Sequence, residues 1–430
     1  MKQIIQSIKK RNSIIGIIGL GYVGLPLCNI FLRNKFTVYG FDIDKNKTNL
    51  LKKKKIYIPN IDNKFKNFIN KKFFVFNDFD KIKKTDVIII CVPTPVTKNN
   101  TPDLSPVIST IKGIIKFIRP NQLIILESST YPGTTEELII NQIKKKFIIG
   151  KNYFVGYSPE REDPGNKKFP MENIPKIVSG YTSKCKFLTR LVYSQVLKKI
   201  VPVSSIAVAE FTKIYENSYR SINIALANES KMLAKKLNLN IFEIINAAKT
   251  KPFGFKAFYP GPGVGGHCIP VDPWYLSWIA KKNNIRLDFL NTAGKVNKSI
   301  TQWIFKNIKL ELKKLGLKIN KQKFFILGAA YKKDINDLRE SPTLDLIRIF
   351  QKMNISFIYN DNHIKKIESK KFKKKYFSKK LNKKNIKEND IIILMTDHSY
   401  YNPKLVINNA RIIFDTRNFF KKKLNKIINL

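Results

Sequence analysis

Cys268 lies in the segment of the chain whose composition most favours chemistry. Residues 259–273 read Tyr-Pro-Gly-Pro-Gly-Val-Gly-Gly-His-Cys-Ile-Pro-Val-Asp-Pro. So many glycines around one cysteine indicate close approach of the backbone to a ligand rather than a core strand. Asp272 and Pro273 suit the N-cap and first position of a following helix. Because a nearby helix N-terminus favours the nucleophilic thiolate form of cysteine, we expect Cys268 to be a nucleophile.

A glycine-rich turn near the start of the chain has the spacing of a dinucleotide site. Gly19-Leu20-Gly21-Tyr22-Val23-Gly24 follows a predicted strand and opens a predicted helix. The first glycine permits the tight turn, the second lets the backbone approach a pyrophosphate, and the third lets helix and strand pack closely. Asp42, eighteen residues after the last glycine, is placed to accept hydrogen bonds from a ribose. Its charge would repel a 2′-phosphate, so the pattern predicts NAD rather than NADP.

Lys213 and Asn217 stand four residues apart in a long predicted helix from Ser205 to about Leu237. That spacing puts both side chains on one face of the helix. An ammonium and an amide held together in this way can stabilise a developing oxyanion. A solvated lysine and an ordinary polar contact of a helix are the plain alternatives, and the spacing alone does not decide between them.

Strands and helices alternate on either side of that long helix. Alternation of short β-branched runs with amphipathic stretches indicates an α/β fold with a parallel sheet covered on both faces. We expect two Rossmann-like doubly wound domains joined by the central helix: residues 1–204 for NAD, 205–315 for dimerisation and the cysteine loop, and 316–430 for the substrate. The Lys-rich stretch from Ile364 to Lys387 reads as a solvated helix and loop. The predicted strands are Ile14–Ile18, Thr37–Phe41, Val87–Cys91, Leu123–Leu126, Phe154–Tyr157, Lys176–Val178, Phe324–Leu327, Ser356–Tyr359, Ile391–Leu394 and Ile412–Phe414.

Composition excludes several classes of protein. Of the 430 residues 43% are hydrophobic, enough for folded cores, and no stretch reaches the length of an apolar membrane span. Glycines interrupt the apolar run from Ile14, so the basic start of the chain is not read as a secretion signal. The other cysteines are expected to be small buried apolar residues, with no disulfide framework and no metal site, which fits a reducing cytoplasm. They are Cys28, Cys91 and Cys185.

The formal net charge of +49 would ordinarily suggest a nucleic-acid partner or an anionic membrane surface. Here the excess is mostly Lys, scattered through the chain together with many Ile and Asn residues. These are the residue types that A/T-rich codons encode, so compositional drift explains the charge better. We expect no specific nucleic-acid partner and no membrane association.

Several blocks in the right order make the chain resemble the UDP-glucose/UDP-N-acetylsugar 6-dehydrogenase family over nearly its whole length. Besides the glycine fingerprint and the Gly-Gly-His-Cys-x-x-x-Asp loop, five further blocks carry the resemblance. They are Cys91-Val-Pro-Thr-Pro, Glu127-Ser-Ser-Thr-Tyr-Pro-Gly-Thr, Ser158-Pro-Glu-Arg-Glu, Glu210-Phe-Thr-Lys-Ile-Tyr-Glu-Asn217 and Arg339-Glu-Ser-Pro342. The resemblance implies a cytoplasmic homodimer that oxidises the C6 alcohol of a UDP-sugar to a carboxylate through a thioester on Cys268, using two NAD.

The resemblance supports the roles argued above for the glycine turn, Asp42, Lys213 and Asn217, and it adds others. It implies that Lys213 and Asn217 stabilise the oxyanion and that Thr130, Glu160 and Asp272 order or activate water. The expected cofactor contacts are Gly19, Gly21, Tyr22, Val23, Gly24, Asp42, Thr94 and Thr130. The expected substrate contacts are Glu160, Arg161, Lys213, Asn217, Tyr259, Gly265, His267, Lys332 and Arg339.

Substrate preference within the family rests on few residues. His267 and the segment Ser158-Pro-Glu-Arg-Glu-Asp-Pro-Gly165 resemble the branch acting on N-acetylated sugars, and the loop from Lys251 to Pro273 is most similar to UDP-N-acetylglucosamine 6-dehydrogenases. The product would feed surface polysaccharide synthesis. UDP-N-acetylmannosamine, UDP-N-acetylgalactosamine and, more distantly, UDP-glucose remain alternatives. Glucose-specific members usually carry Lys where this chain has Val271. A single-step hydroxy acid dehydrogenase and a basic nucleic-acid-binding protein are the rivals from other classes.

Overall fold

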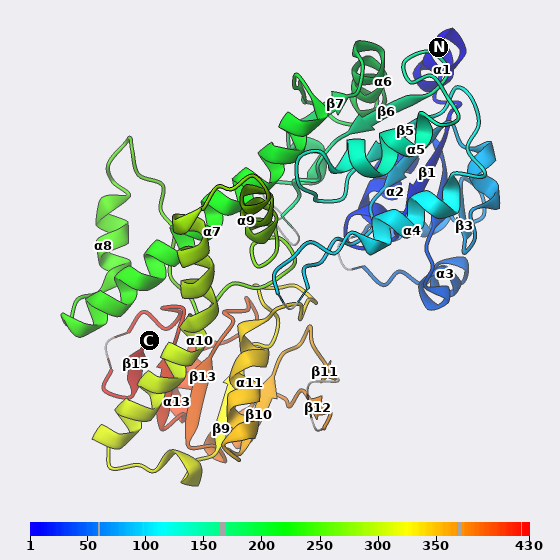
Figure 1. Ribbon diagram of the computed structural model, residues 1–430. Helices are drawn as coiled ribbons and strands as arrows, with labels where there is room; N and C mark the ends of the chain where they lie inside the picture. Colours follow the sequence, from blue (N-terminus) through cyan, green and yellow to red (C-terminus); the bar gives the residue numbers. More distant parts are fainter. Residues whose placement is uncertain (59–60, 98, 164–168, 369–371, 373, 423) are drawn as a thin grey trace. The chain divides into compact units, whose positions relative to one another are not determined.

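The computed structural model describes residues 1–58, 61–97, 99–163, 169–368, 372, 374–422 and 424–430. The chain forms two compact units (Figure 1). The first contains Met1–Glu216 and Trp274–Ile285, and the second contains Asn217–Pro273 and Arg286–Leu430. The long central helix α7 (Ile206–Lys236) starts in the first unit and continues into the second.

The first unit is built on an eight-stranded sheet in the order β3-β2-β1-β4-β5-β6-β7-β8. Its first six strands follow the Rossmann order and are parallel, whereas β6 and β7 pair antiparallel. The strands are β1 (Ile14–Ile18), β2 (Thr37–Phe41), β3 (Phe73–Phe76), β4 (Val87–Ile90), β5 (Leu123–Leu126), β6 (Phe154–Tyr157), β7 (Lys176–Gly180) and β8 (Ile200–Pro202).

Helices bury both faces of this sheet. Side chains alternate along each strand, so Val87 and Ile89 of β4 pack into one hydrophobic cluster while Ile88 and Ile90 pack into another. The helices are α1 (Lys2–Lys9), α2 (Gly24–Arg33), α3 (Lys45–Lys52), α4 (Ser105–Ile114), α5 (Asn141–Ile143) and α6 (Ser183–Ser194). Short 3₁₀ turns lie at Asn63–Asn67, Asp80–Lys84, Met171–Asn173 and Ile319–Lys321, and a π-helical turn at Glu136–Ile140 runs into α5.

The second unit carries a five-stranded parallel sheet in the order β10-β9-β13-β14-β15. Its two faces are also buried, by separate clusters of side chains. The strands are β9 (Phe324–Leu327), β10 (Phe357–Asn360), β13 (Ile391–Leu394), β14 (Ile412–Asp415) and β15 (Ile427–Asn429). The helices are α8 (Ile241–Ala248), α9 (Asp272–Lys282, which continues into the first unit), α10 (Asp288–Lys314), α11 (Pro342–Lys352), α12 (Lys383–Lys387) and α13 (Pro403–Asn409).

The two sheets and the long helix confirm the predicted fold class. The ten predicted strands all form, six with the predicted ends and four with one or both ends shifted by one or two residues. The expectation for the Lys-rich stretch was partly wrong, because β11 (Lys366–Ile367) and β12 (Tyr376–Phe377) pair as an antiparallel hairpin before the short α12. Residues 369–371 and 373 of that stretch lie outside the described residues. Among the described residues, no helix combines the length and apolar character that crossing a membrane requires.

Candidate active site

The glycine fingerprint forms the turn between β1 and α2. Gly19 has φ +93°, a left-handed conformation that favours glycine, and its N–H donates to Phe41 O at 2.8 Å. A methyl group on Gly24 would lie 1.9 Å from Gly19 O, so only glycine lets α2 start this close to β1. Nothing stands within 4 Å of the equivalent position on Gly21, which leaves its backbone open to a ligand. Tyr22 and Val23 lie in the same turn.

Asp42 follows β2 directly and holds this turn from the side. Its Oδ2 accepts from Leu20 N at 2.9 Å and its Oδ1 accepts from Asp44 N at 2.9 Å, while Lys47 Nζ lies 3.4 Å from Oδ2. Each carboxylate oxygen has two acceptor positions, and Leu20 N and Lys47 Nζ use both of those on Oδ2, so Oδ1 retains capacity for a ribose hydroxyl. The open Gly21 backbone and the anchored carboxylate together fit a dinucleotide without a 2′-phosphate.

Thr94 and Thr130 are both buried in the first unit. The carbonyl of Thr94 accepts from Tyr275 Oη at 3.1 Å. The hydroxyl of Thr130 lies 3.5 Å from Glu210 Oε1 on α7. Glu210 also accepts from Gly133 N at 2.7 Å and from Thr135 N at 2.9 Å. Burial raises the pKa of Glu210 to about 7, against the opposing effect of these donors.

Glu160 is held in a buried group of charges. Its Oε2 lies 2.8 Å from Lys176 Nζ, which also contacts Glu127 Oε1 at 3.1 Å. Burial opposes the charge on Glu160, but Lys176 and the N–H groups of Arg161 and Glu162 outweigh it and hold the pKa of Glu160 below its usual value. Glu127 is buried more deeply, and burial raises its pKa. The cluster therefore presents Glu160 as an ionised carboxylate.

Arg161 is engaged within the first unit. Its guanidinium forms a two-point contact with Glu216 of α7, with Nη2–Oε1 at 2.5 Å and Nε–Oε2 at 3.1 Å, and Nη1 donates to Pro175 O at 2.8 Å. This arrangement ties the segment after β6 to α7. Pro164 and Gly165 of the expected substrate motif lie outside the described residues.

The residues expected at the oxyanion lie along α7. Lys213 is buried in the first unit, and Asn217 is the first residue of the second. Asn217 Nδ2 donates to Asp272 Oδ2 at 2.5 Å. The helix expected to follow the N-cap Asp272 begins at Asp272 itself, so the proposed N-cap is the first residue of α9. Asp272 thereby joins α7 and α9 within the second unit.

Cys268 precedes α9 by one turn of backbone. Its carbonyl accepts from Val271 N at 3.1 Å and from Asp272 N at 2.8 Å, and the residue is partly exposed. Upstream, Gly266 N donates to Arg339 O at 2.8 Å. A methyl group on Gly265 would lie 2.4 Å from Tyr331 Cβ, so this glycine is required for the loop to pass Tyr331. His267, next to Cys268, is partly buried.

The remaining predicted substrate residues flank this loop in the second unit. Tyr259 Oη donates to Asn246 Oδ1 at 2.7 Å, and the tyrosine ring is substantially exposed. Arg339 pairs with Asp337 through Nε–Oδ1 at 3.0 Å and Nη2–Oδ2 at 2.7 Å. Lys332 follows Tyr331 directly in the segment after β9. The structure thus brings the cysteine loop together with the segment that carries Lys332 and Arg339.

Sequence reasoning missed charged residues that no local motif marks. A methyl group on Gly261 would lie 2.6 Å from Arg417 Nη1, which places a partly buried guanidinium beside the glycine-rich loop. Lys231 of α7 is also buried there, and burial together with Arg417 lowers its pKa to about 7. The one feature of the sequence that could have indicated Arg417 is its place just after the carboxyl end of β14, because ligands of parallel sheets bind at that end of the strands.

A Rossmann sheet with an open glycine turn and an anchored carboxylate after its second strand is typical of NAD-binding domains, such as those of NAD-dependent dehydrogenases. Comparison with known proteins refines that class. The NAD-binding domain of the UDP-glucose/GDP-mannose dehydrogenase family matches residues 13–197, its central domain 207–299 and its UDP-binding domain 325–422. The chain belongs to this family, as the sequence blocks predicted, and its relatives include UDP-sugar 6-dehydrogenases.

Relatives with different named substrates match at similar levels. The chain is 36% identical to Protein CapL of Staphylococcus aureus, covering 94% of this chain and 96% of CapL. It is 33% identical to the UDP-N-acetyl-D-glucosamine 6-dehydrogenase of Salmonella typhi over 78% of each chain. The solved structure of a UDP-D-ManNAc dehydrogenase from Pyrococcus horikoshii superposes with a TM-score of 0.86 at 29% identity, covering 97% of this chain and 98% of that one.

Proposed function

We propose that the protein oxidises the C6 alcohol of UDP-N-acetyl-D-glucosamine to the carboxylate, with Cys268 as covalent nucleophile. The single observation that carries the proposal is the local geometry of Cys268. It lies in a glycine-rich loop at the start of α9, where Asp272 is tied to Asn217. Oxidation of an alcohol to an aldehyde alone needs no nucleophilic cysteine, whereas oxidation to an acid through an acyl-enzyme does.

The covalent steps follow from the chemistry of an aldehyde and a thiolate. The first oxidation converts the C6 alcohol to an aldehyde with release of a proton. The Cys268 thiolate then adds to the carbonyl carbon, and the carbonyl oxygen becomes the alkoxide or hydroxyl of a thiohemiacetal. Loss of a second hydride and a proton gives the thioester, and water displaces the thiolate to release the carboxylate. NAD held at the turn between β1 and α2 would supply the hydride acceptor for both oxidations, so two NAD would be consumed per sugar.

Charge develops on the C6 oxygen in several of these steps. Lys213 and Asn217 supply an ammonium and an amide from one helix, and both side chains are buried, which strengthens their interaction with an oxyanion. Glu160, kept ionised by Lys176, has the protonation state that a base for the hydrolytic water requires. Thr130 and Asp272 complete the proposed set that orders this water.

Cationic and polar groups of the second unit are proposed to hold the UDP part. Lys332 and Arg339 supply positive charge for the pyrophosphate. Tyr259, Gly265 and His267 line the loop that leads to Cys268. From the first unit we assign Arg161 to the substrate as well, with its guanidinium oriented by Glu216.

The choice of N-acetylglucosamine rests on His267 and the surrounding loop, and relatives named for N-acetylglucosamine and N-acetylmannosamine both match. The test is NADH production with UDP-N-acetylglucosamine, UDP-N-acetylmannosamine, UDP-N-acetylgalactosamine and UDP-glucose. We expect the highest kcat/KM for the first. A higher kcat/KM for another of these sugars would make that sugar the substrate, and the proposed reaction at C6 would still hold. Two NADH per sugar, rather than one, separates this reaction from a single-step hydroxy acid dehydrogenase.

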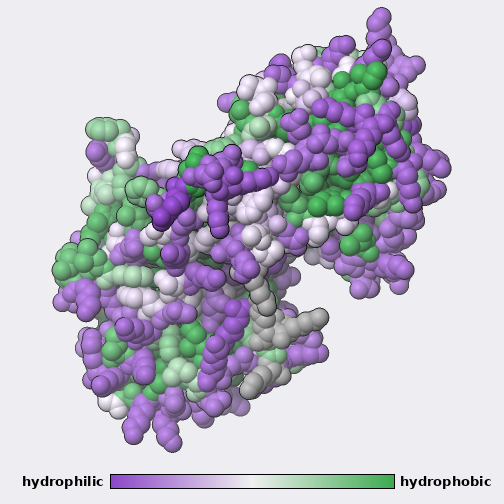
Figure 2. Space-filling model, in the orientation of Figure 1, coloured by the Kyte–Doolittle hydropathy of each residue, from purple (hydrophilic) through white to green (hydrophobic). Residues whose placement is uncertain are grey.

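We also propose that the protein works as a homodimer in the cytoplasm, supplying a nucleotide-activated uronate for surface polysaccharide. Three large apolar side chains lie exposed on the second-unit part of α7, seven residues apart, and a fourth follows the helix directly. Figure 2 shows hydrophobic surface around α8 and the end of α7. The four side chains are Tyr219, Leu226, Leu233 and Leu237. Such a patch on a protein surface is typical of an interface. Light scattering should give a dimer, and Leu226→Glu with Leu233→Glu should give a monomer.

A further inference from the structure

In the turn that follows β9, residues 328–330, every backbone N–H and C=O group has a hydrogen-bond partner. Gly328 N donates to Asn360 O at 2.9 Å, and Ala329 N and Ala330 N both donate to Asp361 Oδ2 at 2.8 Å. Burial opposes the charge of Asp361, but His398 and the N–H groups of Ala330 and Ala329 outweigh it and hold the pKa of this carboxyl at about 2. The Asp361 carboxylate is therefore a permanent acceptor for the turn.

The carbonyl groups of the same turn are bonded by three hydroxyls. Gly328 O accepts from Thr343 Oγ1 at 2.9 Å, Ala329 O accepts from Ser341 Oγ at 2.6 Å, and Ala330 O accepts from Thr396 Oγ1 at 2.6 Å. Buried backbone groups that lose such partners are costly. The turn thus has one well-defined conformation, set from outside by side chains of other elements.

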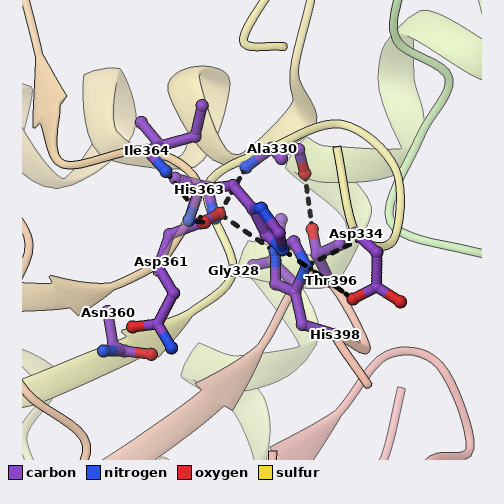
Figure 3. Close-up of polar contacts among 12 residues, drawn as sticks. Gly328, Ala330, Asp334, Asn360, Asp361, His363, Ile364, Thr396 and His398 are labelled. Atoms are coloured by element: carbon purple, nitrogen blue, oxygen red, sulfur yellow. Dashed lines mark hydrogen bonds and ion pairs between the residues drawn. The ribbon is translucent and has the colours of Figure 1, made fainter. Parts of the chain in front are cut away.

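His398 connects this turn to the residues that follow it. The ring is fully buried, with Nε2 3.0 Å from Asp361 Oδ2 and Nδ1 3.0 Å from Asp334 N (Figure 3). A backbone N–H can only donate, so Nδ1 must accept, and the ring proton lies on Nε2 facing Asp361. One side chain therefore links Asp361, which holds the start of the segment, to Asp334, which ends it.

The same cluster contains three potential metal ligands, but its hydrogen bonds favour a different role. Asp334 Oδ1 lies 3.6 Å from His398 Nδ1 and 3.9 Å from His363 Nε2. The only lone pair of His398 Nδ1 already accepts from Asp334 N. A metal ion at Nδ1 would have to break that bond, whereas the observed contacts satisfy the ring completely.

The segment that His398 holds lies directly against the cysteine loop. Between Ala330 and Asp334 it carries Tyr331, whose ring and Cβ would clash with a methyl group on Gly265 or Gly266, at 2.4 and 2.7 Å. Gly266 lies two residues before Cys268. A shift of Tyr331 would therefore move the backbone that carries the thiol.

We propose that His398 is a positioning residue for Cys268: it fixes the segment 329–334 through Asp361 and Asp334, and Tyr331 of that segment sets the conformation of the cysteine loop. The inference rests on the proposed function, in which Cys268 must meet the C6 carbonyl carbon. Displacement of a reacting group by about an ångström lowers a rate by about a hundredfold. His398 itself touches neither substrate nor cofactor in this account.

Two substitutions separate the bonds that His398 makes. His398→Asn keeps an acceptor near Nδ1 for Asp334 N, and His398→Gln keeps a donor near Nε2 for Asp361. His363→Gln is the matched control, because that ring lies beside His398, tilted by 40° with centroids 5.1 Å apart, and its contact with the segment is to the Asp334 side chain at 3.9 Å. The readouts are kcat, the Kd for NAD, Tm, and the rate of Cys268 alkylation by iodoacetamide without substrate.

We expect His398→Gln to lower kcat about tenfold or more and to change the alkylation rate several-fold, with the Kd for NAD unchanged. In His398→Asn, kcat and the alkylation rate should both lie much closer to those of the unaltered protein. His363→Gln should match the unaltered protein in both. Should the His398 variants fail to fold, Thr396→Val removes the bond to Ala330 O with little change of shape and should reproduce the kcat and alkylation effects. Unchanged alkylation and kcat in folded variants would overturn the proposal.

The alkylation readout separates this inference from the proposed function. It needs no turnover, so altered alkylation in His398→Gln supports the positioning role even if the thioester mechanism fails. A different result would refute the inference and indicate a purely structural role for His398. In that case His398→Gln and His398→Asn would lose kcat equally and in line with their lowered Tm values, and Cys268 would be alkylated at the normal rate.

Discussion

The side-chain amide of Asn217 donates to the Asp272 carboxylate across 2.5 Å, although the two residues are 55 positions apart in the sequence. Both side chains are buried. Asn217 lies on α7, and Asp272 is the first residue of α9 and donates its own N–H to the Cys268 carbonyl. The bond therefore fixes the start of α9, and with it the turn that carries Cys268, to the long helix.

Removing the Asn217 amide should affect both stability and turnover. Asn217→Ala leaves a buried carboxylate oxygen without this donor, which costs about 1–3 kcal/mol of unfolding free energy. We expect a lower Tm and a kcat reduced at least tenfold, measured by thermal denaturation and NADH production. Asn223→Ala is the control, because that amide bonds the Tyr219 carbonyl of its own helix at 2.8 Å. Equal effects of the two variants would contradict the role given to Asn217.

Asp42 should decide the choice between NAD and NADP. The carboxylate is anchored by Leu20 N and Asp44 N, and it would repel a 2′-phosphate. The unaltered protein should have a much higher kcat/KM with NAD than with NADP, and Asp42→Ala should reduce this difference. Asp44→Ala is the control: Asp44 caps α3 through Asn46 N and Lys47 N, so its loss should cost about 1 kcal/mol of stability and leave the preference intact. Equal use of both cofactors by the unaltered protein would refute the assignment.

Lys176 should set the pH range in which Glu160 works. Its charge lowers the pKa of Glu160 against the effect of burial, so Glu160 is ionised at neutral pH. Lys176→Met removes this charge and raises the pKa of Glu160. If ionised Glu160 activates water, kcat of the variant should fall at neutral pH and recover as the pH rises, so that the acid limb of the profile moves upward.

The control for that shift is Lys198→Met, which lies on the surface between α6 and β8. Its profile should match that of the unaltered protein. Loss of the buried ion pair also costs about 3–5 kcal/mol, so each profile is measured below the Tm of its variant. An acid limb that stays in place in folded Lys176→Met would show that Glu160 does not act as this base.

The lysine excess should have no specific nucleic-acid partner. Hydrophilic side chains cover much of the face shown in Figure 2 and are not confined to one element. Binding to duplex DNA should therefore be weak and should vanish as salt approaches physiological strength, as non-specific phosphate contacts do. Fluorescence anisotropy with several duplexes at two salt concentrations measures this. A tight complex with one sequence at physiological salt would revive the nucleic-acid interpretation.

The sequence predicted most strands that are apolar runs, but it missed β3 (Phe73–Phe76), a run of four apolar residues, and short strands whose pairing depends on distant residues. Runs such as Ile14–Ile18 are buried on both faces of the sheet, so their apolar composition is enough to predict a strand. The strand β8 (Ile200–Pro202) and the hairpin of β11 and β12 are two or three residues long, and neighbouring strands stabilise them rather than their own composition.

The same limit applies to the site. Glycine spacing and the cysteine loop are local and were read directly from the sequence. Other residues of the site depend on side chains from other elements: Lys176 lies 16 positions after Glu160, and His398 lies 64 positions after Asp334 of the segment beside Cys268. No spacing rule connects such positions, because only the folded sheets bring them together. The family resemblance supplied roles for the motif residues and none for these supports.

Cys268→Ser tests the covalent mechanism most directly. If the thiol only packs in its loop, the nearly isosteric serine should be silent. If it forms the acyl-enzyme, serine is a poor substitute, because its hydroxyl stays unionised at neutral pH and is weakly nucleophilic. We expect folded protein that binds NAD and UDP-sugar but whose kcat falls by orders of magnitude, measured by steady-state NADH production.

The serine variant also offers a view of the intermediate. An oxygen ester formed slowly on Ser at position 268 should hydrolyse more slowly than a thioester, so a covalent adduct can accumulate during incubation with substrate and NAD. Intact-mass spectrometry then shows added mass equal to the uronyl nucleotide. Cys91→Ser, a change at a partly buried thiol beside Glu127, serves as the control that should not accumulate it. Near-normal NADH production by Cys268→Ser would end the thioester proposal, because a residue that carries the acyl group cannot be replaced by a weak nucleophile without loss of rate.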